Sequence, residues 1–311
     1  MAGGLTGCSS EKIASPYRLD SNVSAFSISS QNTDVKMSSF ASALCVGNTN
    51  IITGTNVNMV EASAAALFDV NKSNIIYGKN LHQRLHPASL TKILTALVAL
   101  EEGNPDDIIT VTKDVKVTES GATICGLEEG DTLTLNQALH ALLIQSANDA
   151  ANAIAVHLGG SIDGFADMMN EKAEELGATN SNFVNPHGLS HDDHYSTVYD
   201  LYLIFNKAVT YESFNEIIHM VEYQTIYQDA AGNEKEMDFS STNLFLRGNY
   251  DSPNKVTVIG GKTGTTNAAG NCLILLSKDT SGNPYISVIL RSKERGLLYE
   301  QMIDLLEEIY N

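Results

Sequence analysis

The sequence predicts an α/β protein of the α+β type, in which an antiparallel sheet is flanked by helices and accompanied by a helical lobe. Strand patterns lie at both ends of the folded region, helical patterns fill its middle, and no internal repeat is visible. Strands that are far apart in the chain must then pair in one mostly antiparallel sheet. A cleft between the sheet and the helical lobe is a natural place for chemistry.

Each element follows from a local pattern. Turn residues at 71–73 separate a buried strand from a returning strand. Apolar residues recur every three or four positions over 90–102, a helix that Gly103 ends, and Thr134–Gln137 is a capping box that begins another helix. In chain order, the expected elements are strands at 62–70 and 75–77, helices at 90–102, from 134 on, at 150–158, 163–176 and 197–208, strands at 255–260, 271–277 and 285–291, and a helix at 297–310.

The composition excludes several classes of protein. The 311 residues contain 19 Lys and Arg against 37 Asp and Glu, a net charge of −18, which excludes nucleic acid and anionic membrane surfaces as electrostatic partners. Hydrophobic residues make up 43% of the chain and can form a core, but no run of 18 apolar residues is present that could span a bilayer. The cysteines (Cys8, Cys45, Cys125 and Cys272) lack CxxC spacing, which excludes a disulfide scaffold and a thiolate zinc site but still permits one disulfide.

Residues 1–40 are expected to lie outside the folded domain. Leu5–Cys8 resembles a bacterial lipobox, in which the cysteine is lipidated after a signal peptide is cut just before it, although the charged and apolar regions that should precede it are missing. Residues 9–40 are rich in serine and poor in large apolar side chains. We therefore expect a truncated signal remnant, a flexible spacer, and a lipid anchor at Cys8 that holds the protein on the outer face of the cytoplasmic membrane.

A serine and a lysine three residues apart form the first candidate site. Ser89 lies where the 90–102 helix begins, so backbone N–H groups favour negative charge there, and Lys92 follows on the same face. A serine hydroxyl is a poor nucleophile unless a base takes its proton, and a lysine is such a base when burial or nearby positive charge lowers its pKa. Taken alone, the pattern is more often a capping serine followed by a solvated lysine.

Two further motifs follow along the chain. Ser146 and Asn148 lie in a helical stretch, where residues two apart point in opposite directions, so they share a cleft only if the helix is interrupted there. Residues 260–266 follow the apolar strand Val256–Ile259, and their glycines allow a ligand or another backbone to approach closely. Lys262 and the neighbouring hydroxyls suit a carboxylate. Taken alone, these segments are a polar turn between helices and a glycine-rich turn.

The three motifs in this order resemble the signature shared by class A β-lactamases and penicillin-binding proteins. Over about residues 60–310 the chain is similar to the low-molecular-mass penicillin-binding proteins, the serine-type D-Ala-D-Ala carboxypeptidases of peptidase family S11. The resemblance implies the β-lactamase/transpeptidase-like fold for a catalytic domain at 41–311, without the C-terminal β domain that many members carry. Ala147 replaces a glycine of the family pattern and therefore requires a negative φ. The blocks that carry the resemblance are 84–101, 142–151, 182–189, 194–200 and 261–266.

The resemblance implies removal of the terminal D-Ala from peptidoglycan pentapeptide stems, without cofactor or metal. Penicillins and other β-lactams would acylate the same serine as substrate mimics. The implied catalytic residues are Ser89 as nucleophile, Lys92 as its base and Ser146 as proton relay to the leaving D-Ala. The implied substrate-binding residues are Asn148 on the substrate amide and Lys262, Thr263, Gly264 and Thr265 on the terminal carboxylate, with Arg291 or Arg295 as a further contact and the N–H groups of Ser89 and Thr265 as the oxyanion hole.

Three other interpretations stay open. A class A-like β-lactamase needs an added glutamate for deacylation, and the 160–190 region offers no convincing one. A non-catalytic, lipid-tethered wall-binding protein would not need the intact motifs. A zinc peptidase would use the histidines and aspartates of 187–194, but no HExxH pattern is present, and we expect a polar loop whose Ser196 and Thr197 cap the next helix. Cys45, Cys125 and Cys272 are expected to be small buried hydrophobic residues.

Overall fold

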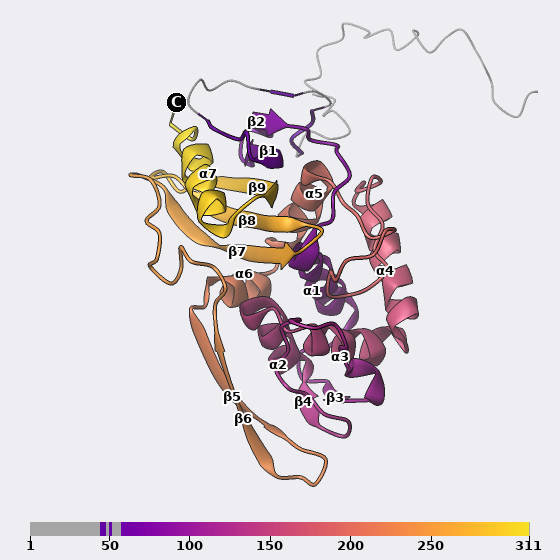
Figure 1. Ribbon diagram of the computed structural model, residues 1–311. Helices are drawn as coiled ribbons and strands as arrows, with labels where there is room; N and C mark the ends of the chain where they lie inside the picture. Colours follow the sequence, from indigo (N-terminus) through magenta and orange to yellow (C-terminus); the bar gives the residue numbers. More distant parts are fainter. Residues whose placement is uncertain (1–43, 48–49, 52–56, 311) are drawn as a thin grey trace, which may run out of the picture. The chain divides into compact units, whose positions relative to one another are not determined.

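A five-stranded antiparallel sheet is the centre of the computed structural model (Figure 1). The structure describes residues 44–47, 50–51 and 57–310. The strand order is β2-β1-β9-β8-β7, so strands from the two ends of the folded region pair, as the sequence predicts. The fold-class prediction is confirmed. The strands are β1 (Ala62–Asp69), β2 (Asn74–Lys79), β7 (Thr257–Thr266), β8 (Gly270–Lys278) and β9 (Pro284–Ser292).

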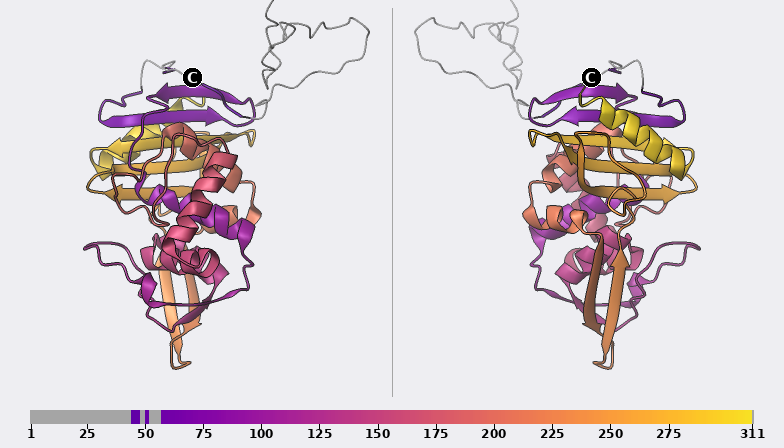
Figure 2. Two further views of the ribbon diagram at one scale, coloured as in Figure 1. Left: turned by 90° about the vertical axis from the view of Figure 1, so that its right-hand side faces the viewer. Right: turned by 90° about the vertical axis from the view of Figure 1, so that its left-hand side faces the viewer.

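Helices cover both faces of this sheet. Along β1, Ala64, Ala66 and Phe68 join the large hydrophobic cluster of the helical lobe, whereas Ala65 and Leu67 join a second cluster beneath α7. Figure 2 shows α7 on one face, with the other helices on the opposite side. The helices are α1 (Thr91–Glu102), α2 (Leu135–His140), α3 (Asn148–Gly159), α4 (Ile162–Glu175), α5 (Val198–Ala208), α6 (Glu212–His219) and α7 (Arg295–Glu307), with the short helical turns η1 (Ala88–Leu90), η2 (Lys113–Val115) and η3 (Ala141–Gln145).

The predicted helix signals act as expected. Gly103 is the C-terminal cap of α1, and every residue of α1 from Thr91 to Ala99 is buried, which makes it the central helix of the lobe. Thr134 and Gln137 form the capping box of α2, with Gln137 N–H donating to the Thr134 hydroxyl and Thr134 N–H donating to Gln137 Oε1. These local rules place α1 and α2 within one or two residues of their predicted positions.

Neither a second sheet nor α6 is among the elements predicted from the sequence. The second sheet contains β3 (Ile108–Thr110), β4 (Thr132–Thr134), β5 (Glu222–Gln228) and β6 (Glu234–Ser240), in the order β3-β4-β5-β6. The last two strands form a long hairpin that runs beside the helical lobe (Figure 2). Their alternation of polar and apolar residues, separated by a turn rich in Asp, Gly and Asn, is a hairpin signal that the sequence does contain.

The glycine-rich motif lies inside a strand, which corrects the prediction of a strand ending near residue 260. β7 continues to Thr266, and Lys262 pairs with Ile274 of β8. The glycines are needed because other backbone comes very close. A Cβ at Gly260 would lie 2.3 Å from the carbonyl oxygen of Ile218 in α6, and one at Gly261 would lie 2.0 Å from that of Ile274. Glycine therefore permits close packing here and does not end the strand.

Cys8 and the 9–40 spacer lie outside the described residues. In the part of the chain that is described, no helix is both long and apolar enough to cross a bilayer. Cys45, Cys125 and Cys272 are free thiols. Cys45 and Cys272 are completely buried, as predicted, but Cys125 is only half-buried, and its thiol donates to the Asp149 carboxylate at 3.3 Å.

Candidate active site

Ser89 occupies a constrained turn in front of α1. The preceding residue, Ala88, has φ +49°, a left-handed conformation that costs a side-chain-bearing residue roughly 1 kcal/mol or more. Two glycines hold this turn from opposite sides. A Cβ at Gly188 would lie 1.9 Å from the Ala88 carbonyl oxygen, and one at Gly264 would lie 2.9 Å from Ser89 N. The 185–189 loop and strand β7 thus fix the position of Ser89.

Lys92 is completely buried beneath Ser89. Its Nζ lies 3.0 Å from Ser89 Oγ, 2.6 Å from Asn148 Oδ1 and 2.7 Å from the His187 carbonyl oxygen. Burial, aided by the positive charge of Lys262, lowers the pKa of Lys92 well below its usual value, while the charge of Asp149 acts in the opposite direction.

The three contacts of Lys92 determine where its lone pair points. A neutral amine has two N–H donors and one lone pair. Asn148 Oδ1 and the His187 carbonyl oxygen can only accept hydrogen bonds, so they take both donors. The lone pair then faces the Ser89 hydroxyl, which is able to donate to it. Neutral Lys92 is therefore oriented to receive the Ser89 proton.

The helix that carries the second motif is interrupted, as its spacing requires. The π-helical turn η3 ends at Gln145, Ser146 adopts φ +69°, and α3 begins at Asn148. This break turns Ser146 and Asn148 to the same cleft. Ala147 has φ −65°, so alanine is accommodated where the family pattern has glycine.

Lys262 is buried on β7, where its Nζ lies 2.9 Å from Ser146 Oγ and 2.9 Å from the Thr263 carbonyl oxygen. Burial lowers the pKa of Lys262 to about 7. Among the described residues, no carboxylate forms an ion pair with it. A negatively charged ligand at this position would favour the protonated lysine.

A cavity of about 190 Å³, which we call the Arg295 cavity, opens beside Ser89. It identifies two residues that the motifs do not reveal: Thr242, whose hydroxyl lies 2.6 Å from that of Thr263, and Thr123. Arg295 lines this cavity and donates to the Thr242 carbonyl oxygen at 3.3 Å, whereas Arg291 is not among the lining residues. The lining residues are Ser89, Thr123, Ser146, Thr242, Thr263, Gly264, Thr265, Cys272, Arg295, Leu298 and Tyr299.

A second cavity of about 320 Å³, which we call the Glu119 cavity, also opens at Ser89. It shares Ser89, Thr123 and Thr265 with the Arg295 cavity. Apart from Leu189, its lining side chains are small or polar, and Glu119 alone among them carries a charge. The remaining lining residues are Ser120, Gly121, Ala122, Asn148, Gly188, Leu189, Thr266 and Asn267.

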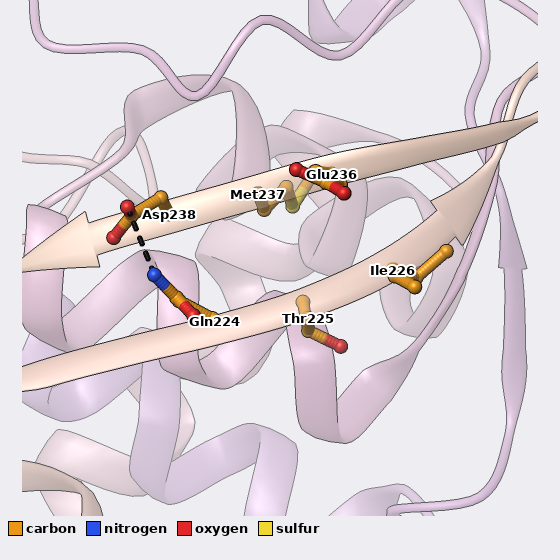
Figure 3. Close-up of a pocket in the computed structure, with 6 residues that line it drawn as sticks. All are labelled: Gln224, Thr225, Ile226, Glu236, Met237 and Asp238. Carbon is orange, nitrogen blue, oxygen red and sulfur yellow. Dashed lines mark hydrogen bonds between the residues drawn. The ribbon is translucent and has the colours of Figure 1, made fainter.

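A larger cavity of about 510 Å³ lies on the β5–β6 hairpin and is shown in Figure 3. Gln224 and Asp238 are joined across it by a 3.1 Å hydrogen bond, and Ile226 and Met237 also line it. It shares no lining residue with the two cavities at Ser89, and it contains no activated nucleophile. The candidate chemistry therefore belongs to Ser89.

The histidine-rich loop is structural around His194. The His194 ring is engaged at both nitrogens, with Nε2 2.8 Å from Thr91 Oγ1 and Nδ1 accepting from the Val184 N–H at 3.2 Å. Within the described residues, no three His, Cys, Asp or Glu side chains are grouped as a metal site. Thr197 caps α5 by accepting from the Asp200 N–H, as predicted.

Known proteins match both the sequence and the fold. The family model described as D-alanyl-D-alanine carboxypeptidase matches residues 51–294. D-alanyl-D-alanine carboxypeptidase DacF of Bacillus subtilis is 33% identical over 255 residues, which cover 78% of this chain and 61% of the relative. The chain spans only about three fifths of the length of such curated relatives.

Solved structures agree with this match. The DD-transpeptidase of Streptomyces K15 has a TM-score of 0.74 and 26% identity, covering 80% of this chain and 97% of that one. D-alanyl-D-alanine carboxypeptidase of Mycobacterium tuberculosis has a TM-score of 0.73 and 26% identity, covering 85% and 96%.

Proposed function

This chain belongs to the D-alanyl-D-alanine carboxypeptidase family, peptidase family S11, and we propose that it removes the terminal D-Ala from peptidoglycan stem peptides through an acyl-enzyme on Ser89. One observation carries the proposal. Nζ of buried Lys92 lies within hydrogen-bond distance of Ser89 Oγ and of two groups that can only accept, so a neutral Lys92 has its lone pair left for the Ser89 hydroxyl. A neutral, buried lysine beside a serine is one way to activate the hydroxyl for nucleophilic attack without a histidine.

In the acylation step, Ser89 Oγ attacks the carbonyl carbon of the penultimate D-Ala and its proton passes to Lys92 Nζ. The N–H groups of Ser89 and Thr265 stabilise the oxyanion, and one such donor contributes about 3 kcal/mol in other serine enzymes. The contact between Gly264 and Ser89 N supports this role, because it brings the strand that carries Thr265 against the nucleophile.

Ser146 gives its hydroxyl proton to the nitrogen of the leaving D-Ala and takes one from Lys262 in its place, while the proton from Ser89 stays on Lys92 until the ester is hydrolysed. Lys262 Nζ donates to Ser146 Oγ at 2.9 Å, which occupies an acceptor position of that hydroxyl and leaves its hydrogen to point at the leaving group. The C–N bond then breaks, D-Ala departs, and water hydrolyses the ester on Ser89. These steps require no cofactor.

The substrate carboxylate enters the Arg295 cavity. Arg295 and the hydroxyls of Thr263 and Thr265 line this cavity, and Lys262 is buried behind it, with its Nζ bonded to the lining residue Ser146. Asn148 holds the substrate amide. β-Lactams carry a carboxylate at the corresponding position and acylate the same serine.

The proposal includes the setting of the enzyme. Peptidoglycan lies outside the cytoplasm, so the partners are pentapeptide stems and β-lactams, with no nucleic acid. Residues 41–311 act as the catalytic domain, and residues 1–40 tether it to the outer face of the cytoplasmic membrane through lipid on Cys8. Mass spectrometry of the protein recovered from membranes tests the anchor, because lipidated Cys8 adds the mass of the acyl chains.

The test of the activity is intact-protein mass spectrometry with penicillin, together with D-Ala release from diacetyl-Lys-D-Ala-D-Ala. We expect one penicillin adduct on the peptide that contains Ser89. Ser89→Ala should abolish both the adduct and D-Ala release, whereas Ser281→Ala, on an exposed turn, should change neither.

The same experiment separates the other interpretations. An adduct that disappears within seconds would indicate a β-lactamase, although no carboxylate from 160–190 lines either cavity. Absence of both adduct and D-Ala release in the unmodified protein would indicate a non-catalytic wall-binding protein. D-Ala release that persists in Ser89→Ala would refute the assigned nucleophile.

A further inference from the structure

The Glu119 cavity is the side of the cleft where the rest of the stem peptide must lie, an assignment that rests on the proposed function. With the terminal carboxylate in the Arg295 cavity and the scissile carbonyl at Ser89, the acyl portion extends in the other direction. That direction leads past Asn148 and Thr265, which both line the Glu119 cavity.

Glu119 gives this cavity its charge. Its side chain is exposed, and within the described part of the chain no ion pair or side-chain hydrogen bond engages its carboxylate. Arg295 is the charged side chain among the residues that line the other cavity. The two ends of the cleft therefore present opposite charges to a bound peptide.

The loop that carries Glu119 is tied to the catalytic helix α3. Asn148 N–H donates to the Thr123 carbonyl oxygen at 2.8 Å. The neighbouring Asp149 carboxylate accepts from three successive backbone N–H groups, those of Cys125 at 2.9 Å, Gly126 at 2.8 Å and Leu127 at 3.0 Å. A buried carboxylate that is satisfied in this way fixes the loop relative to Asn148, and so limits where Glu119 can be.

The geometry points to the third residue of the stem peptide as the group that Glu119 meets. The penultimate D-Ala is bonded to Ser89, and the third residue precedes it in the peptide, with its Cα about 3.8 Å from the Cα of that D-Ala. We propose that Glu119 pairs with a free ammonium on the side chain of that residue. Among stem peptides, those whose third residue carries an unblocked side-chain amine are then preferred over those in which that amine is blocked.

The test compares two peptides that differ only at the side-chain amine: Nα-acetyl-Lys-D-Ala-D-Ala with a free ε-amine and the same peptide acetylated there. We expect kcat/KM to be about two- to fivefold higher for the free amine, the range for one partly exposed ion pair, and the difference to shrink as salt is added. Glu119→Gln should remove this preference while retaining activity on the acetylated peptide.

Glu129→Gln is the matched control. Glu129 is an exposed carboxylate farther along the same segment that lines neither cavity at Ser89. We expect this variant to keep the full preference. Three results would overturn this inference but leave the proposed function standing. They are equal kcat/KM for the two peptides in the unmodified enzyme, a preference that survives in Glu119→Gln, and the same loss of preference in both variants. Failure to release D-Ala from either peptide would instead overturn the proposed function, and this inference with it.

Discussion

Two completely buried lysines lie on opposite sides of the cleft, and their surroundings give them different capabilities. Lys92, at the start of α1, faces two pure acceptors and one hydroxyl, which match the two donors and one lone pair of a neutral amine. Lys262, on β7, faces one pure acceptor and one hydroxyl, so its charged form has a third N–H for an incoming carboxylate. Burial lowers the pKa of both lysines, and the positive charge of Lys262 lowers that of Lys92 further. The number of acceptors, more than the residue type, separates a base from a binding group.

Replacing each lysine by arginine should give the largest difference in activity between the two positions. A guanidinium keeps its charge and cannot accept a proton near neutral pH, so Lys92→Arg removes the base. We expect penicillin acylation of Lys92→Arg to slow by about 10²- to 10⁴-fold, the usual contribution of a general base. Lys262→Arg retains positive charge and should slow acylation much less than Lys92→Arg does. Stopped-flow acylation rates measure both effects.

Thermal unfolding of the two variants is the control, because arginine is larger than lysine and both positions are buried. If the two folded variants lost acylation equally, the separate roles of Lys92 and Lys262 would be wrong.

The Lys92 side also depends on Gly188, which follows the residue whose carbonyl accepts from Lys92. Gly188 has φ +85°, and a Cβ there would lie 1.9 Å from the Ala88 carbonyl oxygen. Gly232 has nearly the same φ, +82°, with no neighbouring atom in the way. We expect Gly232→Ala to lower the free energy of unfolding by about 1 kcal/mol and Gly188→Ala by about 2–4 kcal/mol, because only the latter adds a steric clash.

Urea unfolding at neutral pH measures the free energy of unfolding of the two variants. The rate of penicillin acylation reports whether the His187 carbonyl has moved away from Lys92. Gly188→Ala should also slow acylation, whereas Gly232→Ala should not. Equal losses of stability would mean that the 185–189 loop tolerates a shift and does not hold the nucleophile turn.

The sequence predicts one side of this comparison better than the other. Ser89, Lys92 and the helix break at Ser146 follow from local rules, namely helix periodicity and the opposite directions of residues two apart. Strand β7 was cut short in the prediction, because glycines suppress the strand signal, and only tertiary packing against α6 and β8 explains why they are there.

The residues that the sequence missed come from positions without a local signal. Thr123 and Thr242 lie on segments that enter the cleft only through long-range contacts, and Arg295 could not be distinguished from Arg291 before β9 and α7 were placed. The β5–β6 hairpin did have a signal, its alternating pattern, and could have been predicted. Catalytic motifs with regular spacing can be predicted from the sequence, whereas the residues that line a cavity depend on how the chain folds.

The smallest expected effect is a change in the pH profile, and it sharpens the assignment of the two lysines. In the proposed mechanism, acylation needs neutral Lys92 and charged Lys262. As pH falls, Lys92 takes up a proton and the rate decreases. As pH rises through about 7, the pKa of Lys262, this group loses its proton and the attraction for the substrate carboxylate weakens. We therefore expect kcat/KM to be bell-shaped, with an alkaline limb that begins near pH 7.

The variant Lys262→Arg tests the origin of that limb. Because a guanidinium stays charged throughout this range, the alkaline limb should disappear while the acidic limb, which reports Lys92, remains in place. In the unmodified enzyme, the alkaline limb of the kcat profile should lie at higher pH than that of the kcat/KM profile, because the bound substrate carboxylate raises the pKa of Lys262 in the complex. An alkaline limb that persists in Lys262→Arg would assign it to another group and leave the charge of Lys262 without a role in binding.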